Sequence, residues 1–515
     1  MSEIVDASIK KAVKGTTLLL AGTVFSVLLL ISTKILIARN TTKEELGTYT
    51  LCIAVASVVS LIATLGVNEG IARYVSLFLG KGDIAEADSR SRSALQINLV
   101  SGITAGLALY LCADFLSISV FQSKALAQPL RILSLSVPFF MMAQALNAVL
   151  RGHGIITSKI YYIDVGIPLY FLLSLSVSLL FNMTFLSILY AYVFAVILGC
   201  ISIGSYGYSK IRLNPFYFCN TRQRYELLRF SFPLLIGIFM SMIMKWSGTL
   251  MLGRYVGAKA VGIFDVSNSL SMLLLFPLAA LEFVFLPIAG SLHGKGQYYE
   301  LARTYQVLTK WVFSVTVPAF FILFLFPEQA ITFLFGERFN EAAPILRILS
   351  SGLLFHSFWG PNGIIMVVIG MSREIMYVSF FGAIVNIVLN YLMISFYALG
   401  IIGAAFASIG TYISLNILVS IIIYRKTGTH PLTTHYIKAI FCAALMGFAI
   451  NLISGILPRY PWLVFLYFFI YCIGYAILLI VTHSIDAKDI SLFKAMTETA
   501  KTKGRELKES ISRTV

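Results

Sequence analysis

Charged residues are scarce in this sequence, and their scarcity excludes most classes of protein. They make up 12% of the 515 residues, whereas 58% are hydrophobic, and the mean hydropathy is +0.87. A typical soluble domain carries roughly 25% charged residues. The chain therefore lacks the polar surface of a soluble, secreted or fibrous protein, and we expect it to lie in a membrane.

Closely spaced cysteines and clusters of metal ligands are lacking too. The six cysteines are scattered, with none in a Cys-x-x-Cys pair, so the sequence predicts neither a zinc site nor a disulfide framework. No loop between the predicted helices gathers acidic residues in a metal-binding pattern. We therefore expect no cofactor, no metal and no enzymatic activity.

Long apolar runs are abundant instead. Thr16 to Ala38 and Pro461 to Val481 are both long enough to cross a hydrocarbon core, which takes ~20 residues. Backbone amides find no water in lipid, so such runs form helices. We predict an all-α integral membrane protein with about fourteen transmembrane helices: Leu18–Ala38, Gly47–Gly66, Ser93–Cys112, Leu130–Leu150, Ile160–Phe181, Leu186–Tyr206, Phe230–Leu252, Val261–Ile288, Leu308–Pro327, Ile345–Ile369, Met376–Tyr397, Gly403–Tyr424, Ile437–Leu457 and Trp462–Thr482.

The distribution of basic residues predicts the orientation of these helices. The net charge is +16, and most of the 39 Lys and Arg residues fall in the segments that lie inside when the amino terminus is inside. The positive-inside rule then places both termini of this multi-pass cell-membrane protein in the cytoplasm. The basic tail carries no RNA-binding motif, so we expect it to contact anionic headgroups and not nucleic acid.

The sequence contains an internal repeat. Leu130–Ser134 recurs letter for letter as Leu346–Ser350, and the Gly-Lys-Gly of Gly80–Asp83 recurs in Gly294–Gln297. Matches at one offset indicate a duplicated unit. A third match joins Arg39, Gly47 and Tyr49 to Arg254, Gly262 and Phe264.

The offset covers six helices, so both copies have the same orientation, as in transporters whose lobes are related by an axis along the membrane normal. We expect two lobes with a cavity between them, and rocking of the lobes for alternating access. The predicted units are an amino-terminal lobe (1–206), a cytoplasmic linker (207–229), a carboxy-terminal lobe (230–424), two further helices (437–482) and a basic tail (483–515).

Charged residues inside the apolar runs are candidate site residues, because each costs about 2.5–3.5 kcal/mol at mid-bilayer on insertion scales. Lys34 and Lys245 fall on the same face of the two helices that the repeat relates. We expect both to face the cavity, where they could hold an anion such as a diphosphate. Two alternatives stay open: Lys34 extends to the headgroups, or Lys245 forms a structural pair with Asp265 at similar depth.

Two further residues have a functional and a structural interpretation. Glu282 is either an ion-coupling carboxylate or a residue of the cytoplasmic rim. Arg73 follows Glu69 by four residues, the spacing of a local helical ion pair. Arg73 is therefore either half of that pair or a gatekeeper for phosphate.

Four segments in the first 90 residues resemble the polysaccharide-biosynthesis flippases, the O-antigen and teichoic-acid export family of the multidrug/oligosaccharidyl-lipid/polysaccharide exporter superfamily. The predicted helix number and the repeat extend the resemblance over the whole chain. The segments are Lys34–Arg39, Glu44–Tyr49, Leu65–Val75 and Gly80–Asp83.

The resemblance implies a V-shaped, two-lobed flippase, monomeric by default. Its substrate would be a polyprenyl-(di)phosphate-linked oligosaccharide, moved from the cytoplasmic to the outer leaflet, with or without H⁺ or Na⁺ coupling. Lys34, Lys245 and Arg73 would then be substrate-binding residues, and Asp265 and Glu282 an ion-coupling or structural set. The family's cavity is divergent, so the resemblance assigns no exact contact.

Three other kinds of membrane protein would show different features in the sequence. A cation-coupled multidrug antiporter of the sister family usually has twelve helices and an acid in helix one, where this chain has Lys34. A peptidoglycan-precursor flippase has fourteen helices and a basic cavity, so the sequence separates it poorly. A membrane glycosyltransferase needs acidic metal ligands on an early outer loop, which offers only Glu44 and Glu45 beside Lys43.

Overall fold

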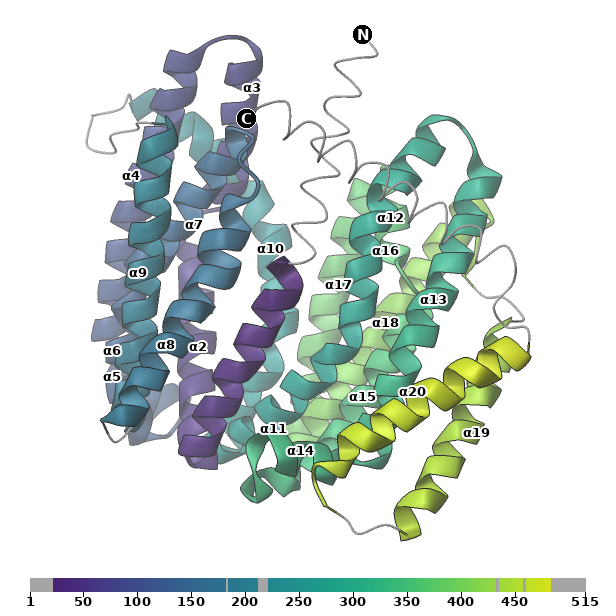
Figure 1. Ribbon diagram of the computed structural model, residues 1–515. Helices are drawn as coiled ribbons and strands as arrows, with labels where there is room; N and C mark the ends of the chain where they lie inside the picture. The colour runs from purple at the N-terminus through teal and green to yellow at the C-terminus, as the bar shows by residue number, and fades with distance from the viewer. Residues whose placement is uncertain (1–21, 182–183, 212–220, 432–434, 457–459, 483–515) are drawn as a thin grey trace, which may run out of the picture.

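The computed structural model describes residues 22–181, 184–211, 221–431, 435–456 and 460–482. Every regular element in these ranges is a helix, which confirms the all-α prediction. Figure 1 shows the helices as two upright bundles side by side, with the first described helix, Gly22–Asn40, between them. Residues 212–220 of the basic linker and the whole basic tail (483–515) lie outside the described residues.

The first bundle contains eight α-helices and three short π or 3₁₀ segments. They are α2 (Lys43–Ala63), α3 (Val67–Gly80), α4 (Ile84–Leu111), α5 (Ala113–Phe115), η1 (Leu116–Val120), η2 (Lys124–Leu126), α6 (Ala127–Ser134), α7 (Ser136–Gly152), η3 (Lys159–Gly166), α8 (Ile167–Leu180) and α9 (Phe185–Ile211).

The second bundle follows the same general order. Its elements are α10 (Thr221–Tyr255), α11 (Ala258–Ser271), η4 (Met272–Leu275), α12 (Phe276–Gly294), α13 (Tyr298–Leu325), α14 (Pro327–Phe335), η5 (Glu337–Ala342), α15 (Ala343–Phe358), α16 (Asn362–Val368), α17 (Ser372–Asn390), η6 (Tyr391–Phe396) and α18 (Gly400–Thr427). Two last helices, α19 (His435–Ile456) and α20 (Leu463–Val481), lie against the outside of this bundle beside α13 (Figure 1).

Eleven of the described helices are long and apolar enough to cross a membrane, or twelve if the bent pair Lys124–Ser134 and Ser136–Gly152 is one span. The expected number was about fourteen. Two predicted spans account for the difference. The predicted helix Ile345–Ile369 is broken into α15 and α16 before Asn362, because Pro361 has no amide hydrogen and cannot continue a helix. The apolar part of α19, Lys438–Ser454, is short.

The two bundles repeat the same element pattern at the offset found in the sequence. α4 and α13 are both 28 residues long and begin 214 residues apart. α9 and α18 begin 215 residues apart, at Phe185 and Gly400. The repeated Leu-Arg-Ile-Leu-Ser segments lie in α6 and α15.

One contact between the bundles is the crossing of α2 and α11, and another is that of α2, α3 and α4 with α10. At the crossing of α2 and α11 the backbones are in direct contact, because a Cβ atom added to Gly47 would lie 1.7 Å from the carbonyl oxygen of Ala258. A Cβ atom on Gly262 would lie 2.1 Å from the carbonyl oxygen of Lys43. The glycines and the two carbonyl residues are each related by the repeat, so the contact is the same from both sides.

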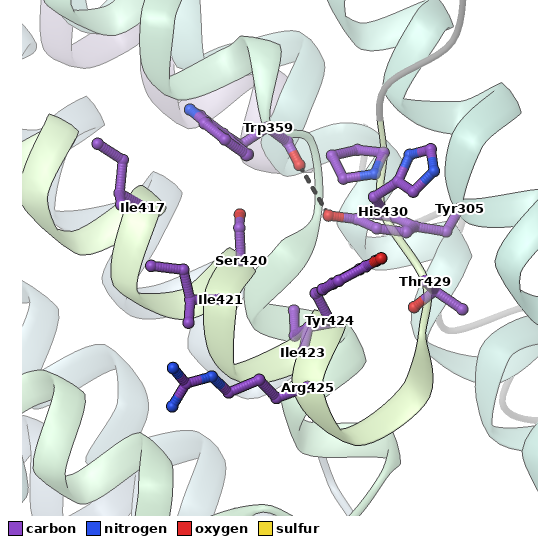
Figure 2. Close-up of a pocket in the computed structure, with 11 residues that line it drawn as sticks. Tyr305, Trp359, Ile417, Ser420, Ile421, Ile423, Tyr424, Arg425, Thr429 and His430 are labelled. Carbon is purple, nitrogen blue, oxygen red and sulfur yellow. Dashed lines mark hydrogen bonds between the residues drawn. The ribbon is translucent and has the colours of Figure 1, made fainter.

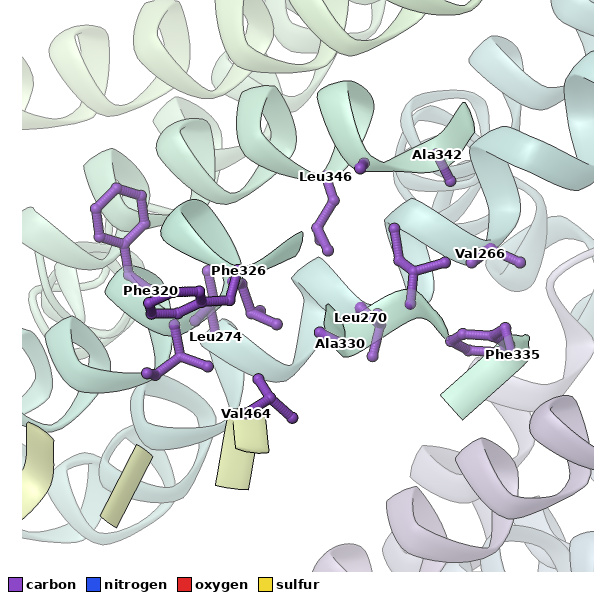
Figure 3. Close-up of a cluster of buried hydrophobic side chains, with 14 of the residues drawn as sticks. Val266, Leu270, Leu274, Phe320, Phe326, Ala330, Phe335, Ala342, Leu346 and Val464 are labelled. Carbon is purple, nitrogen blue, oxygen red and sulfur yellow. The ribbon is translucent and has the colours of Figure 1, made fainter. Parts of the chain in front are cut away.

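A large apolar core joins the second bundle to the last two helices and to residues of the first bundle. Figure 3 shows side chains of α11, α13, α14, α15 and α20 converging, among them Leu270, Phe320, Ala330, Leu346 and Val464. All five are buried. The short helix α14 therefore packs between the helices of the second bundle and α20.

Candidate functional site

An ion pair joins the first helix to the second bundle. Lys34 Nζ lies 2.6 Å from Asp265 Oδ1 and 2.5 Å from Oδ2, on α11. The same ammonium donates to Ser269 Oγ at 3.1 Å, and Thr50 of α2 donates to Asp265 Oδ2 at 3.0 Å. The lysine side chain is 24% exposed and the aspartate 11%. Three helices thus meet at one carboxylate whose hydrogen bonds compensate its burial.

This geometry corrects the predicted partner of Asp265. We considered a structural pair with Lys245, but the carboxylate is taken by Lys34. The repeat placed both lysines on the same face of the related helices and could not tell which of them reached α11. Since Lys34 points into this pair, it does not extend to the headgroups.

Lys245 lies on α10 and lines a cavity of ≈ 300 Å³ between α2, α3, α7 and α10. Its ammonium stands over the ring of Trp246, 5.1 Å from the centroid. Among the described residues it has no ion-pair partner, and its side chain is accessible. Lys34 does not line this cavity, although its charge repels that of Lys245. Lys245 is therefore a cation available to a ligand.

The rest of the cavity is largely polar on one side. Ser57 and Ser60 of α2 and Thr64, which directly follows it, are spaced three and four residues apart, so they share one face. Sequence reasoning missed this face, and the spacing of the hydroxyls was the signal that could have found it. The other lining residues are Leu61, Gly66, Asn68, Glu69, Phe140, Met141, Gln144, Ile238, Met242 and Trp246.

Two polar atoms of the cavity lining lack partners. Within the described part of the chain, Asn68 Oδ1 and Trp246 Nε1 are buried and make no hydrogen bond. A buried polar atom without a partner is costly, so such atoms are usually satisfied by water or a ligand. Lys245 and the donor Trp246 Nε1 can bind an anionic group, and the acceptor Asn68 Oδ1 can take a hydrogen bond from a hydroxyl group.

The predicted ion pair between Glu69 and Arg73 is wrong. Glu69 accepts a hydrogen bond from Arg151 of α7 at 2.8 Å. Arg73 instead lies over the ring of Phe230 on α10, 4.5 Å from its centroid. The guanidinium of Arg151 on the neighbouring α7 lies within ion-pair distance of Glu69, whereas that of Arg73 on the same helix points to Phe230. Arg73 is exposed at the edge of the first bundle and does not line the cavity with Lys245.

Glu282 stands apart from these residues. It is half-buried on α12, beyond the 3₁₀ break of η4, and has no ion-pair partner in the described ranges. Asp265 and Glu282 therefore do not share a site, and only Asp265 lies near a candidate cation.

The end of the bundles that carries α14 is closed by two reciprocal arginine contacts, which the sequence did not reveal. Arg39, on the first helix, donates to the carbonyl oxygens of Phe333 and Leu334 at the end of α14. Arg338 of η5 donates in return to the carbonyl oxygens of Arg39 and Thr41, at 3.2 and 2.8 Å. Cations at helix carboxyl ends are favoured by the helix dipole.

An ion pair lies beside these contacts. Lys43, the first residue of α2, is 2.6 Å from Glu341 of η5. We call the contacts of Arg39, Arg338 and the Lys43–Glu341 pair the α14-end contacts. They connect the first helix and the first bundle to the second bundle at the end that carries α14, whereas α4 contacts α10 at the opposite end, where Arg90 lies 2.7 Å from Glu226.

Comparison with protein families gives two matches. The model described as "Polysaccharide biosynthesis protein" matches residues 12–293, which is more than half of the chain. A model described as "MatE" matches residues 233–392. These matches confirm the resemblance stated from the sequence.

Two curated relatives are similar over part of their length. An uncharacterized membrane protein of Methanocaldococcus jannaschii is 28% identical over 36% of this chain and 37% of its own. The teichuronic acid biosynthesis protein TuaB of Bacillus subtilis is 24% identical over 24% of this chain and 25% of its own. The shared regions thus span between a quarter and two fifths of these relatives.

Solved structures share the fold. The lipid II flippase MurJ in an inward closed conformation superimposes with a TM-score of 0.72 at 16% identity, over 90% of this chain and 98% of that one. An inward-facing multidrug resistance MATE family transporter of the MOP superfamily gives 0.67 at 17% identity, over 78% and 94%. The fold of this chain is therefore that of MATE and MurJ proteins.

Proposed function

This chain belongs to the polysaccharide biosynthesis protein family, and on that premise we propose that it is a flippase for a polyprenyl-(di)phosphate-linked oligosaccharide. The substrate passes from the cytoplasmic to the outer leaflet during synthesis of a cell-surface glycan. The name of the relative TuaB, a teichuronic acid biosynthesis protein, supports a glycan substrate.

The availability of Lys245 carries this proposal. A diphosphate needs a cation that no carboxylate already neutralises, and Lys245 is such a cation in a cavity with further hydrogen-bond donors. Hydrogen bonds between charged groups are about twice as strong as neutral ones. We assign the diphosphate to Lys245, Gln144 and Trp246, with the sugars towards the hydroxyl face of α2.

Lys34 takes a second role in the proposal. Its ion pair with Asp265 connects the first helix to α11, and a diphosphate at Lys245 offers Lys34 a competing anion. Transfer of Lys34 from Asp265 to the phosphate would weaken a contact between the bundles. Substrate binding would thus be coupled to the movement that alternating access requires.

Orientation completes the proposal. Following the distribution of basic residues, we place both termini in the cytoplasm, with the α14-end contacts on the outer side. The described state is then closed towards the outside. We count the broken pair α15–α16 and the shorter α19 as two further spans, which gives fourteen with two six-helix lobes related by the repeat.

A cation-coupled multidrug antiporter is the second candidate, favoured by the MatE match over residues 233–392. In that case Asp265 or Glu282 would have to bind the coupling ion. Asp265 is already neutralised by Lys34 and hydrogen-bonded by Thr50, so it is poorly placed for this task. Peptidoglycan-precursor flipping, supported by the likeness to MurJ, differs from the main proposal only in the sugar.

The test is flipping of a fluorescent polyprenyl-diphosphate oligosaccharide in proteoliposomes. We expect Lys245→Ala to reduce flipping roughly tenfold or more, since a hydrogen bond to a charged group contributes about 1.5–3 kcal/mol. Lys34→Ala should reduce it as well, while Lys124→Ala, an exposed cation outside the cavity, should not.

The outcomes separate the function from the site. Normal flipping by correctly folded Lys245→Ala protein would show that the site is wrong. No flipping of any polyprenyl-diphosphate glycan by the wild type, together with proton- or sodium-driven drug uptake, would favour the antiporter.

A further inference from the structure

A second cavity lies in the second bundle, away from Lys245. It measures ≈ 380 Å³ and is formed by the last three turns of α18 together with α13, Trp359 and the segment after α18. Figure 2 shows its lining: Tyr305, Trp359, Ile417, Ser420, Ile421, Ile423, Tyr424, Arg425, Thr429, His430 and Pro431. It shares no residue with the cavity of Lys245 and is not explained by the proposed function.

The position of this cavity indicates contact with lipid. Ile417, Ile421 and Tyr424 belong to one of the apolar helices that cross the membrane, and all three side chains are exposed. They follow one side of α18 and lead to Arg425 in its last turn (Figure 2). From Ile417 to Arg425 this side is about 12 Å long. The cavity thus has an apolar side facing lipid and a cation at the membrane boundary.

Arg425 is available to an anion. Its neighbour Lys426 is paired with Glu374 of α17 at 2.5 Å. Arg425 itself is exposed and has no ion-pair partner within the described ranges. His430, also exposed, lies across the cavity and is held there by a hydrogen bond from Gln306 to its carbonyl oxygen, at 3.0 Å.

Two hydrogen-bonding groups in the lining are unused. Within the part of the chain that the structure describes, Trp359 Nε1 and Ser420 Oγ are buried and have no partner. The backbone of Trp359 is fixed, because Tyr305 donates from its hydroxyl to the carbonyl oxygen of Trp359 at 3.0 Å. Buried donors without partners mark a place where a polar ligand group or water belongs.

We propose that this cavity binds an anionic phospholipid of the leaflet at this end of α18. The phosphate contacts Arg425, the glycerol and ester oxygens meet Ser420, and one acyl chain lies along Ile421 and Ile417. Trp359 and Tyr424 at the rim suit the headgroup level, where tryptophan and tyrosine are enriched in membrane proteins. A free anion would use only Arg425 and would leave the apolar side uncovered.

Trp359 supplies a direct measurement on the full-length protein. Phenylalanine replaces the other three tryptophans, Trp246, Trp311 and Trp462, and the protein is reconstituted in phosphatidylcholine vesicles with a small fraction of brominated phosphatidylglycerol. Bromine quenches nearby tryptophan, so we expect Trp359 to be quenched more strongly than by the same fraction of brominated phosphatidylcholine. Arg425→Gln should lower the apparent affinity for the anionic lipid about fivefold, the effect of about one basic charge near an anionic surface.

Matched variants distinguish the site from general attraction. Arg373→Gln removes an exposed charge next to Glu374 without touching the cavity, and it should leave the preference unchanged. Ser420→Leu keeps Arg425 but fills the cavity, and it should abolish the preference.

Three results would overturn the proposal. The first is an equal loss in Arg425→Gln and Arg373→Gln, which would indicate a diffuse surface charge. The second is the absence of any preference for brominated phosphatidylglycerol. The third is removal of the preference by inorganic phosphate, which would identify a soluble anion as the occupant. Each readout is independent of flipping, so failure here leaves the proposed function intact.

Discussion

Gly47 and Gly262 occupy equivalent places in two copies of one repeat, and they face each other across the crossing of α2 and α11. Each glycine lies against the backbone of the other helix, Gly47 against Ala258 and Gly262 against Lys43. These carbonyl residues are themselves 215 positions apart. The glycines were visible in the sequence as a repeated letter, and the structure gives the reason: only a hydrogen atom fits at either place.

We predict that Gly47→Ala and Gly262→Ala each destabilise the protein by at least about 2 kcal/mol, as overpacking of a tight contact does. The added methyl group meets backbone, which cannot move away as a side chain can. Thermal unfolding in detergent measures the effect. Gly290→Ala on α12 is the control, since nothing lies within 4 Å of its added Cβ. Equal stability of all three variants would contradict the crossing.

The reciprocal arginines should hold the α14 end closed. We expect Arg39→Ala and Arg338→Ala to lengthen the distance between spin labels at Lys124 and Glu337, one on each bundle. Without the guanidinium, the carbonyl oxygens at two helix ends lose their donors.

Arg131→Ala is the matched control for this experiment. Its partner Asp114 belongs to the same bundle, at 2.5 Å, so the label distance should stay as in the wild type. The same distance in the Arg39 and Arg338 variants would show that other contacts close this end.

Acid should weaken the α14-end contacts. The hydrogen bond from Lys43 holds the pKa of Glu341 below its ordinary value of 4.5. A carboxyl group with a lowered pKa stabilises the folded contact above its ordinary range, and this contribution is lost as the pH falls through the lowered pKa.

The same label pair tests the prediction during acid titration. A population with a longer distance should increase below pH 4.5. The change should be modest, because exposed ion pairs contribute little. At neutral pH, the label distances in Glu341→Gln should match those of the wild type at acid pH. If the distances in this variant still change with pH as in the wild type, another group causes the transition.

The effects of substituting Lys34 and Asp265 on the free energy of unfolding should depend strongly on each other. Asp265→Asn leaves Lys34 without its anion, and Lys34→Met leaves Asp265 with Thr50 as its remaining donor. We expect each change to cost about 3 kcal/mol, as breaking a buried pair does. The double variant should cost much less than the sum, because neither charge is then left alone. Unfolding of the four proteins in detergent measures the coupling, and additive effects would show that the pair contributes nothing as a pair.

The helices and the repeat could be predicted because each depends on short stretches of the sequence and not on contacts between distant residues. An apolar run of sufficient length leaves the backbone no choice but a helix, and equal segments such as Leu130–Ser134 and Leu346–Ser350 reveal a duplicated unit. The break before Asn362 was not predicted, although Pro361 inside the predicted span Ile345–Ile369 is a residue that interrupts helices.

The partners of charged side chains could not be predicted in the same way. Lys34 and Asp265 are 231 residues apart, and their contact depends on how the first helix lies against α11. Likewise, Glu69 pairs with Arg151 of a neighbouring helix and not with Arg73 of its own helix. Spacing along a helix limits which residues can meet, but inter-helix packing decides which do.

The first helix is attached to two bodies at once. Ser26 donates to the carbonyl oxygen of Asp164 in the first bundle, whereas Lys34 and Arg39 bind the second. Only about 12 Å of helix separates Ser26 from Lys34, too short a stretch to absorb a rotation by smooth bending. One attachment must therefore yield when the bundles turn, and without substrate this is the neutral hydrogen bond of Ser26, because it is weaker than the two charged ones. The first helix then moves with the second bundle until a bound diphosphate draws Lys34 away from Asp265.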